Sequence, residues 1–291
     1  MERMPTGLLV LLIGLSPVAA GDEPPAAPAS AAEQFAAMAK EFNSEGFALR
    51  QAKTDEEREA VVVRVEKITQ RLLQLAEKNP KTPAAMNALV QAVNQEIWME
   101  NNSSHPGRGQ ESPAVRAIAL LLRDHVRNDN VDAATWRMSY GFRKECETFL
   151  RTAAEVNAHR EVRALASLRL AQFLNGRLQR LDLLKERAEM AKRYEGLFGK
   201  DYLEALQQQD RAKAIQEVEA LFELAARKYG DVKLPYGGTV REKTNSELYE
   251  IRHLAVGMAA QDLEGDDQEG KRFKLSDFRG KVVLLYFWSE Y

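Results

Sequence analysis

Apolar and polar positions along the middle of the chain follow the period of an α-helix. Between residues 30 and 253, apolar side chains recur every three or four positions, and Val61, Val65 and Ile68 form one such series. Short polar breaks separate these stretches, so neighbouring helices are expected to run antiparallel and to cover each other's apolar faces. The pattern predicts a domain of antiparallel α-hairpins that loosely resembles a helical repeat. Such arrays often bind partners, but a packed structural domain is the simpler interpretation.

Residues that favour helix starts define where several of these helices begin. Ser30–Glu33, Thr54–Glu57 and Thr244–Glu247 each place a hydroxyl three positions before a glutamate, the pattern of a capping box. Thr82 and Ser112 each precede a proline, which is tolerated at the first helical position. The helix after Thr244 is expected to end near residue 253 and to close the helical domain. Apolar spacing predicts further helices over Phe142–Asn157, Glu161–Tyr194 and Arg211–Tyr229.

The pattern changes after residue 253. Phe273 and Leu275 alternate with charged residues, as in a short half-buried strand, and the stretch Ser276–Gly280 is typical of a turn. The continuous apolar run Val282–Trp288 then suits a central strand that is covered on both faces. We therefore expect residues 254–291 to form strands and not a further helix.

The first twenty residues have the pattern of a secretory signal peptide. An apolar run over Gly7–Leu15 is followed by small residues at Val18 and Ala20, which predicts cleavage after Ala20. The run is too short to cross a bilayer, which needs about 20 apolar residues. Residues 21–29, with three prolines, are expected to form an extended Pro/Ala-rich linker. We expect export to the periplasm or cell envelope, without a membrane span in the mature chain; a buried N-terminal helix is the alternative.

Composition and charge argue against a nucleic-acid-binding protein and against a disulfide-rich or cysteine-rich metal protein. The chain carries 41 basic and 43 acidic side chains, and nucleic-acid binding would need a net or clustered positive charge. With 45% apolar and 29% charged residues, the 291-residue chain has the composition of a globular protein of about two domains. The single cysteine excludes an intrachain disulfide framework and a cysteine-rich metal site.

The helical part shows no pattern that indicates a catalytic, cofactor or metal site. Cys146 shares a predicted helix face with Phe142 and Phe149, so it is expected to be a buried core residue and not a reactive thiol. The four histidines, at positions 105, 125, 159 and 253, lack the paired spacing of metal ligands. His125 continues an apolar face and is expected at the edge of the core. The turn that contains Gly237 lacks the strand-then-helix context of a phosphate-binding loop.

A further motif lies in the last 38 residues. It consists of Val256-Gly257, Asp262-Leu263-Glu264-Gly265, Gly270-Lys271-x-Phe273-x-Leu275-Ser276-Asp277-Phe278-Arg279-Gly280-Lys281 and Val282-Val283-Leu284-Leu285-x-Phe287-Trp288. This pattern resembles the start of the redoxin domain, as found in thioredoxin-like thiol–disulfide oxidoreductases and in the alkyl hydroperoxide reductase/thiol-specific antioxidant group. It departs from the family at Ala259 and Gln261, where prolines are usual. The helical part also looks like the N-terminal extension that some bacterial envelope redoxins carry.

The resemblance implies a mainly α protein in which a helical domain, residues 30–253, precedes the N-terminal part of a thioredoxin-like α/β domain, residues 254–291. In this family the Phe-Trp pair is soon followed by Trp-Cys-x-x-Cys at a helix start, where the first cysteine is a thiolate that attacks a disulfide or a peroxide. The family's partners are protein thiols or disulfides, or a thiol reductant. The resemblance implies no cofactor or metal. Separately, the carboxylates of Asp266 and Asp267 are adjacent in a turn, where they diverge, so we do not expect them to act as an acid–base pair.

None of the family's catalytic residues is present in this chain, because they are expected just beyond Tyr291. A thioredoxin-like domain needs about 100 residues, and the run that ends at Trp288 would otherwise be an exposed apolar strand prone to aggregation. Three causes would each explain why the catalytic residues are missing: a fragmentary gene model, degeneration to a helical module, or a UGA codon for selenocysteine that was read as a stop. We expect the chain as given to be inactive as an oxidoreductase. The alternative is a non-catalytic helical binding or scaffold module of the cell envelope.

Overall fold

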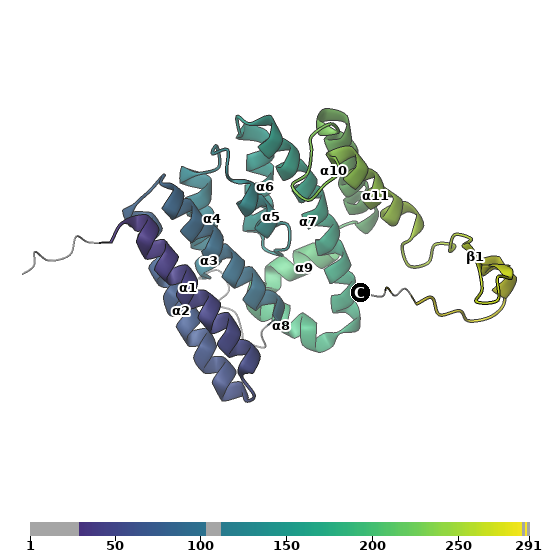
Figure 1. The fold of residues 1–291 in the computed structure, drawn as a ribbon, viewed down its shortest axis with the longest axis horizontal. Helices are drawn as coiled ribbons and strands as arrows, with labels where there is room; N and C mark the ends of the chain where they lie inside the picture. The colour runs from purple at the N-terminus through teal and green to yellow at the C-terminus, as the bar shows by residue number, and fades with distance from the viewer. Residues whose placement is uncertain (1–28, 103–111, 287–288, 290–291) are drawn as a thin grey trace, which may run out of the picture. The chain divides into compact units, whose positions relative to one another are not determined.

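The computed structural model describes residues 29–102, 112–286 and 289, and this part of the protein is mainly α-helical (Figure 1). Eleven helices and one two-stranded antiparallel sheet are present in the described residues, which confirms the predicted mainly α fold with few strands. The predicted signal peptide, residues 1–20, lies outside the described residues, as does the predicted linker apart from its last residue, Ala29.

Helices that are neighbours in sequence are in most cases neighbours in space. The described helices are α1 (Ala31–Gln51), α2 (Asp55–Lys78), α3 (Pro83–Asn102), α4 (Pro113–Asp124), α5 (Asp132–Met138), α6 (Lys144–Val156), α7 (Arg160–Glu186), α8 (Ala188–Phe198), α9 (Lys200–Gln208), α10 (Arg211–Tyr229) and α11 (Val240–His253). Helices α1 to α4 pack one on the next, whereas α5, α6 and α10 all pack against the long helix α7 (Figure 1). This arrangement buries a continuous apolar core that extends from α2 to α11.

Hydrogen bonds at the helix starts explain why several helices begin where the sequence predicts. The Thr54 hydroxyl accepts a hydrogen bond from the Glu57 N–H at 3.2 Å, and the Glu57 carboxylate accepts one from the Thr54 N–H at 3.2 Å. These two bonds are the predicted capping box of α2. The hydroxyls of Thr82 and Ser112 accept hydrogen bonds from N–H groups in the first turns of α3 and α4. Each bond satisfies an N–H that has no partner within its helix.

The third capping box lies one turn earlier than predicted. Helix α11 begins at Val240, and its box is formed by Thr239 and Glu242, with N–H to side-chain oxygen distances of 2.8 and 3.3 Å. Thr244, the predicted cap, is buried within the helix, where its hydroxyl donates to the Arg241 carbonyl at 3.0 Å. Both segments match the sequence pattern, but only the earlier start buries Val240 against the core. Tertiary packing therefore selects between two equivalent local signals.

The predicted helix over Glu161–Tyr194 is interrupted. Arg187, with φ −125° and ψ 87°, separates α7 from α8. The change of direction allows Tyr194 and Phe198 of α8 to pack against Phe142, with ring centroids 5.0 and 4.9 Å apart. Burial of these three aromatic side chains outweighs one interrupted turn of helix, since a fully buried large apolar side chain stabilises by about 1.5–3 kcal/mol. The short helices α5 and α9 were not predicted, because they are too short for a distinct apolar period.

The segment after α11 forms a small hairpin. Strand β1 (Glu264–Asp266) pairs with β2 (Arg272–Lys274) in antiparallel register, with Gly265 opposite Phe273. The 3₁₀ turn η2 (Leu275–Phe278) follows where a turn was predicted. The strand predicted at Phe273 is present as β2, but it is exposed and not half-buried, and no described residue between 254 and 286 is buried.

The apolar run after the hairpin forms no strand in the described residues. Residues 282–286 pair with no other segment, and Phe287 and Trp288 lie outside the described residues. A central strand requires a partner on each side and a layer on each face, and the described chain supplies neither. Exposure still alternates along the run, because Val283 and Leu285 are partly covered while Val282, Leu284 and Tyr286 are almost fully exposed. This period of two is typical of an extended strand.

Replacement of Thr239 by alanine tests the revised start of α11. The variant loses the hydroxyl that caps the first turn, and we expect the free energy of unfolding to fall by about 1 kcal/mol, measured by urea unfolding. Thr148→Ala is the matched control, because the exposed Thr148 hydroxyl donates to the carbonyl of Lys144 within α6 and caps no N–H group. Equal stability of the Thr239→Ala variant and the wild type would show that α11 does not depend on this cap.

Candidate functional site

Cys146 lies in the core, as predicted. It is 1% exposed, on the buried face of α6 that also contains Phe149. A Cβ added at Gly141 would come within 2.6 Å of the Cys146 sulfur, so the backbone of residue 141 packs directly against this side chain. A reactive thiol requires access to its substrate, and this position provides none.

Burial of Cys146 predicts slow modification. The rate of reaction with 5,5′-dithiobis(2-nitrobenzoate) in the native protein should be at least about 100-fold lower than in 6 M guanidinium chloride, because the thiol is reached only when the core opens. A single thiol that reacts at the same rate in both conditions would contradict its placement in the core.

The three histidines in the described part of the chain form no common site. His125 is buried at the end of α4, His159 precedes α7, and His253 is the last residue of α11, with its ring 4.8 Å from that of Tyr249. His105 lies outside the described residues. In the described ranges, no group of three or more His, Cys, Asp or Glu side chains could hold a metal ion.

His125 is nonetheless unusual, because it is only 2% exposed and neither ring nitrogen has a hydrogen-bond partner among the described residues. Burial lowers the pKa of His125, and the nearby Asp124 only partly opposes this shift. In the unfolded chain, His125 has the ordinary histidine pKa near 6.5 and binds a proton as the pH falls toward that value. In the folded protein the lowered pKa keeps the imidazole neutral at the same pH. Below that pH the unfolded state binds more protons, so stability is lost as the pH falls.

We expect His125→Leu to remove this pH dependence. Between pH 7.5 and 5.5 the free energy of unfolding of the wild type should fall by up to about 1.4 kcal/mol more than that of the variant. The comparison is made by urea unfolding at both pH values. His159→Gln, at an exposed position, serves as the control and should keep the wild-type dependence. Parallel pH profiles for the wild type and His125→Leu would contradict the assignment.

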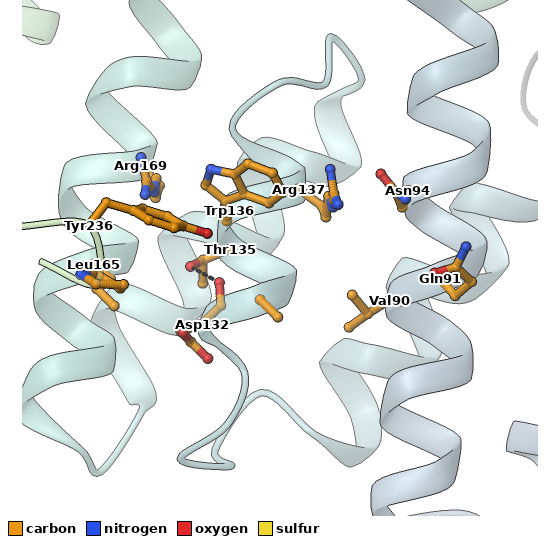
Figure 2. Close-up of a pocket in the computed structure, with 12 residues that line it drawn as sticks. Val90, Gln91, Asn94, Asp132, Thr135, Trp136, Arg137, Leu165, Arg169 and Tyr236 are labelled. Carbon is orange, nitrogen blue, oxygen red and sulfur yellow. Dashed lines mark hydrogen bonds between the residues drawn. The ribbon is translucent and has the colours of Figure 1, made fainter. Parts of the chain in front are cut away.

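A pocket of about 320 Å³ lies between α3, α5, α7 and the loop that precedes α11 (Figure 2). Helix α5 contributes five of the twelve lining residues, the largest share of any element. Its inner face, with Ala134 and Met138, is buried in the core, and its outer face presents Asp132, Trp136 and Arg137 to the pocket. The same short helix therefore anchors the pocket to the core and supplies its chemistry.

Two arginines line this pocket without an acidic partner. The Arg137 guanidinium lies 4.0 Å from the centroid of the Trp136 ring, a cation–π contact. Arg169 of α7 donates to the Gln172 side chain at 2.8 Å. Neither arginine forms an ion pair with any carboxylate in the described residues. Burial lowers the pKa of both guanidinium groups, while Tyr140 and Tyr236 oppose this shift, and both groups remain cationic at neutral pH.

A glycine turn brings an aromatic ring to the edge of the pocket. Gly237 and Gly238 adopt φ values of 96° and 74°, which favour glycine, and they close the loop between Lys233 and Thr239. Tyr236, just before these glycines, is 86% exposed, and its ring lies beside the pocket with the hydroxyl directed inward (Figure 2). The two glycines therefore position Tyr236, and the turn that they form lacks the strand-then-helix context of a phosphate-binding loop.

The adjacent carboxylates of the hairpin have separate structural surroundings. Asp266 is part of β1, whereas Asp267 accepts hydrogen bonds from the N–H groups of Glu269 and Lys271 at 3.0 and 2.8 Å and fixes the turn. The Asp267 carboxylate is therefore engaged in the turn of the hairpin.

Comparison with protein-family models, with curated proteins and with solved structures finds no match for this chain. Among the described helices, none combines the length and the apolar composition that a membrane span requires. Function must therefore be argued from the residues and from the geometry of the pocket and the hairpin.

Proposed function

We propose that the chain is an exported protein of redoxin type that contains a helical domain and the first part of a thioredoxin-like domain, without the redox centre. The observation that carries this proposal is the motif that extends from Gly270 to Trp288. Export to the periplasm or cell envelope rests on the pattern of residues 1–20. As given, the chain has no thiol that could exchange with a disulfide, because Cys146 is buried.

The hairpin gives several motif residues a physical role that supports the proposal. The Asp262 carboxylate accepts hydrogen bonds from the Ser276 N–H at 2.8 Å and from the Ser276 hydroxyl at 2.7 Å, which ties the turn η2 to the chain just before β1. The Asp277 carboxylate accepts from the Lys274 N–H at 2.9 Å and fixes the exit from β2. These bonds direct the chain from β2 into the extended run 282–286, the order of elements that the resemblance implies.

The activity implied by the resemblance is thiol–disulfide or peroxide chemistry. The first cysteine of a Cys-x-x-Cys motif at a helix N-terminus is held as a thiolate by unpaired N–H groups and by the helix dipole. That thiolate attacks one sulfur of a disulfide and expels the other as a thiolate, or attacks a peroxide oxygen and expels hydroxide or alkoxide, which leaves a mixed disulfide or a sulfenic acid. The second cysteine then attacks the sulfur of the first, forms a disulfide with it and releases the bound thiol or water. In a longer product the helical domain would lie directly before this catalytic domain.

A second function, a non-catalytic binding module of the cell envelope, is favoured by a different observation. The pocket beside α5 holds two arginines that have no acidic partner in the described residues. The two guanidinium groups are partly buried and share the pocket with one carboxylate, that of Asp132, so a bound anion would balance the remaining positive charge. This function requires only the helical domain, so it does not depend on the redoxin proposal.

Genomic sequence beyond the codon for Tyr291 tests the redoxin proposal. We expect an in-frame continuation in which x-x-Cys follows a cysteine codon or a UGA codon. The longer product should reduce insulin disulfides or consume peroxide, and replacement of its first redox residue by serine should abolish this activity. The 291-residue chain should be inactive in both assays. Sequence without such a continuation, or a longer product inactive in both assays, would overturn the proposal.

Export is tested separately by expression of the full chain in a Gram-negative host. The mature protein should be recovered from the periplasm with Gly21 as its first residue, because the small residues at Val18 and Ala20 define the cleavage site. Ala20→Lys is the informative variant, since a large charged residue at the last position before cleavage should block processing. An uncleaved wild-type chain in the cytoplasm would contradict the proposed location.

A further inference from the structure

The pocket between α3, α5 and α7 has a composition that selects for one kind of ligand. Its charged groups are the guanidinium groups of Arg137 and Arg169 and the carboxylate of Asp132. Together they leave one net positive charge, which a monoanion would neutralise. Asp132 lies in the first turn of α5, so its carboxylate already occupies the position at which a helix N-terminus would favour an anion. A dianion such as a phosphate monoester would meet repulsion there.

The arginines have the geometry of anion-binding groups. Arg137 is held with its guanidinium over the Trp136 indole, which restricts its motion and leaves the edge N–H groups available. Arg169 is held by Gln172, whose amide in turn donates to the Glu247 carboxylate at 2.7 Å. A neutral amide thus stands between the Arg169 guanidinium and Glu247. This arrangement orients the positive charge without neutralising it, and it leaves the guanidinium able to bind an external carboxylate.

The remaining walls of the pocket combine aromatic and aliphatic side chains with the uncharged polar groups of Gln91, Asn94 and Thr135. Tyr236 extends over one side from its glycine turn, and Figure 2 shows the Trp136 ring between the two arginines in that view. Val90 from α3 and Leu165 from α7 supply aliphatic surface. A volume of about 320 Å³ is at the lower end of the range for small-molecule sites. Planar apolar groups of modest size fit such walls.

We propose that this pocket binds a small aromatic carboxylate. Arg137 and Arg169 supply the positive charge for the carboxylate group. Trp136 and Tyr236 supply the surface for the aromatic part. The ligand is either a free aromatic acid or the C-terminal aromatic residue of a peptide, which share this chemistry. The inference rests on the binding function proposed for the helical domain, and it is independent of the redoxin proposal because every lining residue precedes residue 254.

Calorimetry with a matched pair of ligands tests this inference on the full chain. N-acetyl-L-phenylalanine should bind with a dissociation constant in the millimolar range or below, and N-acetyl-L-phenylalaninamide, which lacks the carboxylate, should bind at least about tenfold more weakly. A peptide that ends in phenylalanine with a free carboxylate distinguishes the two sources. Equal or tighter binding of the peptide identifies a chain terminus as the ligand, and its exclusion identifies a free acid. Equal affinity for the acid and the amide, or no binding of either, would overturn the proposal.

Variants identify the site. Arg137→Gln and Arg169→Gln should each weaken N-acetyl-L-phenylalanine binding by about tenfold or more, whereas Arg58→Gln, which removes an exposed arginine of α2, should leave it unchanged. Tyr236→Ala should also weaken binding, and this exposed side chain can be removed without damage to the core. Unchanged affinity in folded Arg169→Gln and Tyr236→Ala proteins would show that the ligand binds elsewhere, which would also overturn the proposal.

Discussion

Helix α7 must be buried on nearly all of its sides, and the rest of the helical domain is arranged around that requirement. Its 27 residues contain buried side chains at almost every turn, so no single apolar face exists for one neighbour to cover. Helices α5, α6 and α10 share the task. The one arginine buried along it, Arg177, bonds the Glu147 carboxylate at 2.6 Å. Although burial opposes it, Arg177 together with Arg151 lowers the pKa of Glu147, so the pair stays ionised within the core.

The pocket is a consequence of the same packing. Because α5 has only seven residues, it covers a limited length of α7 and leaves Arg169 partly exposed. The loop that carries Tyr236 then closes one side. The outer face of α5 lines the pocket, which leaves room there for the side chains of Trp136 and Arg137. A short helix on a fully buried one thus provides a rigid position for polar side chains.

Much of the helical domain was predictable from local signals, and the site was not. The starts of α2, α3 and α4 depend on hydroxyl and proline residues that act within one turn, so sequence alone identifies them. The start of α11 and the interruption at Arg187 depend on how Val240 and Tyr194 pack against distant residues, which local patterns do not contain. Trp136 and Arg137 lie on a helix too short to give an apolar period. They line the same pocket as Arg169, which lies about 30 residues further along the chain.

In the C-terminal segment, short-range contacts form the local structure, but the long-range pairing that a core strand requires is absent from the described residues. Its hairpin is held by near contacts, such as the Glu264 carboxylate with Arg272 at 3.1 Å, and these form without a surrounding core. The run 282–286 alternates in exposure like a strand but lacks neighbours to pair with in the described chain. Hydrogen bonds along a strand come only from a partner strand, whereas a turn satisfies its own groups. Pairing along the run 282–286 therefore requires a strand that the described residues do not supply, whereas the hairpin before it already satisfies its own groups.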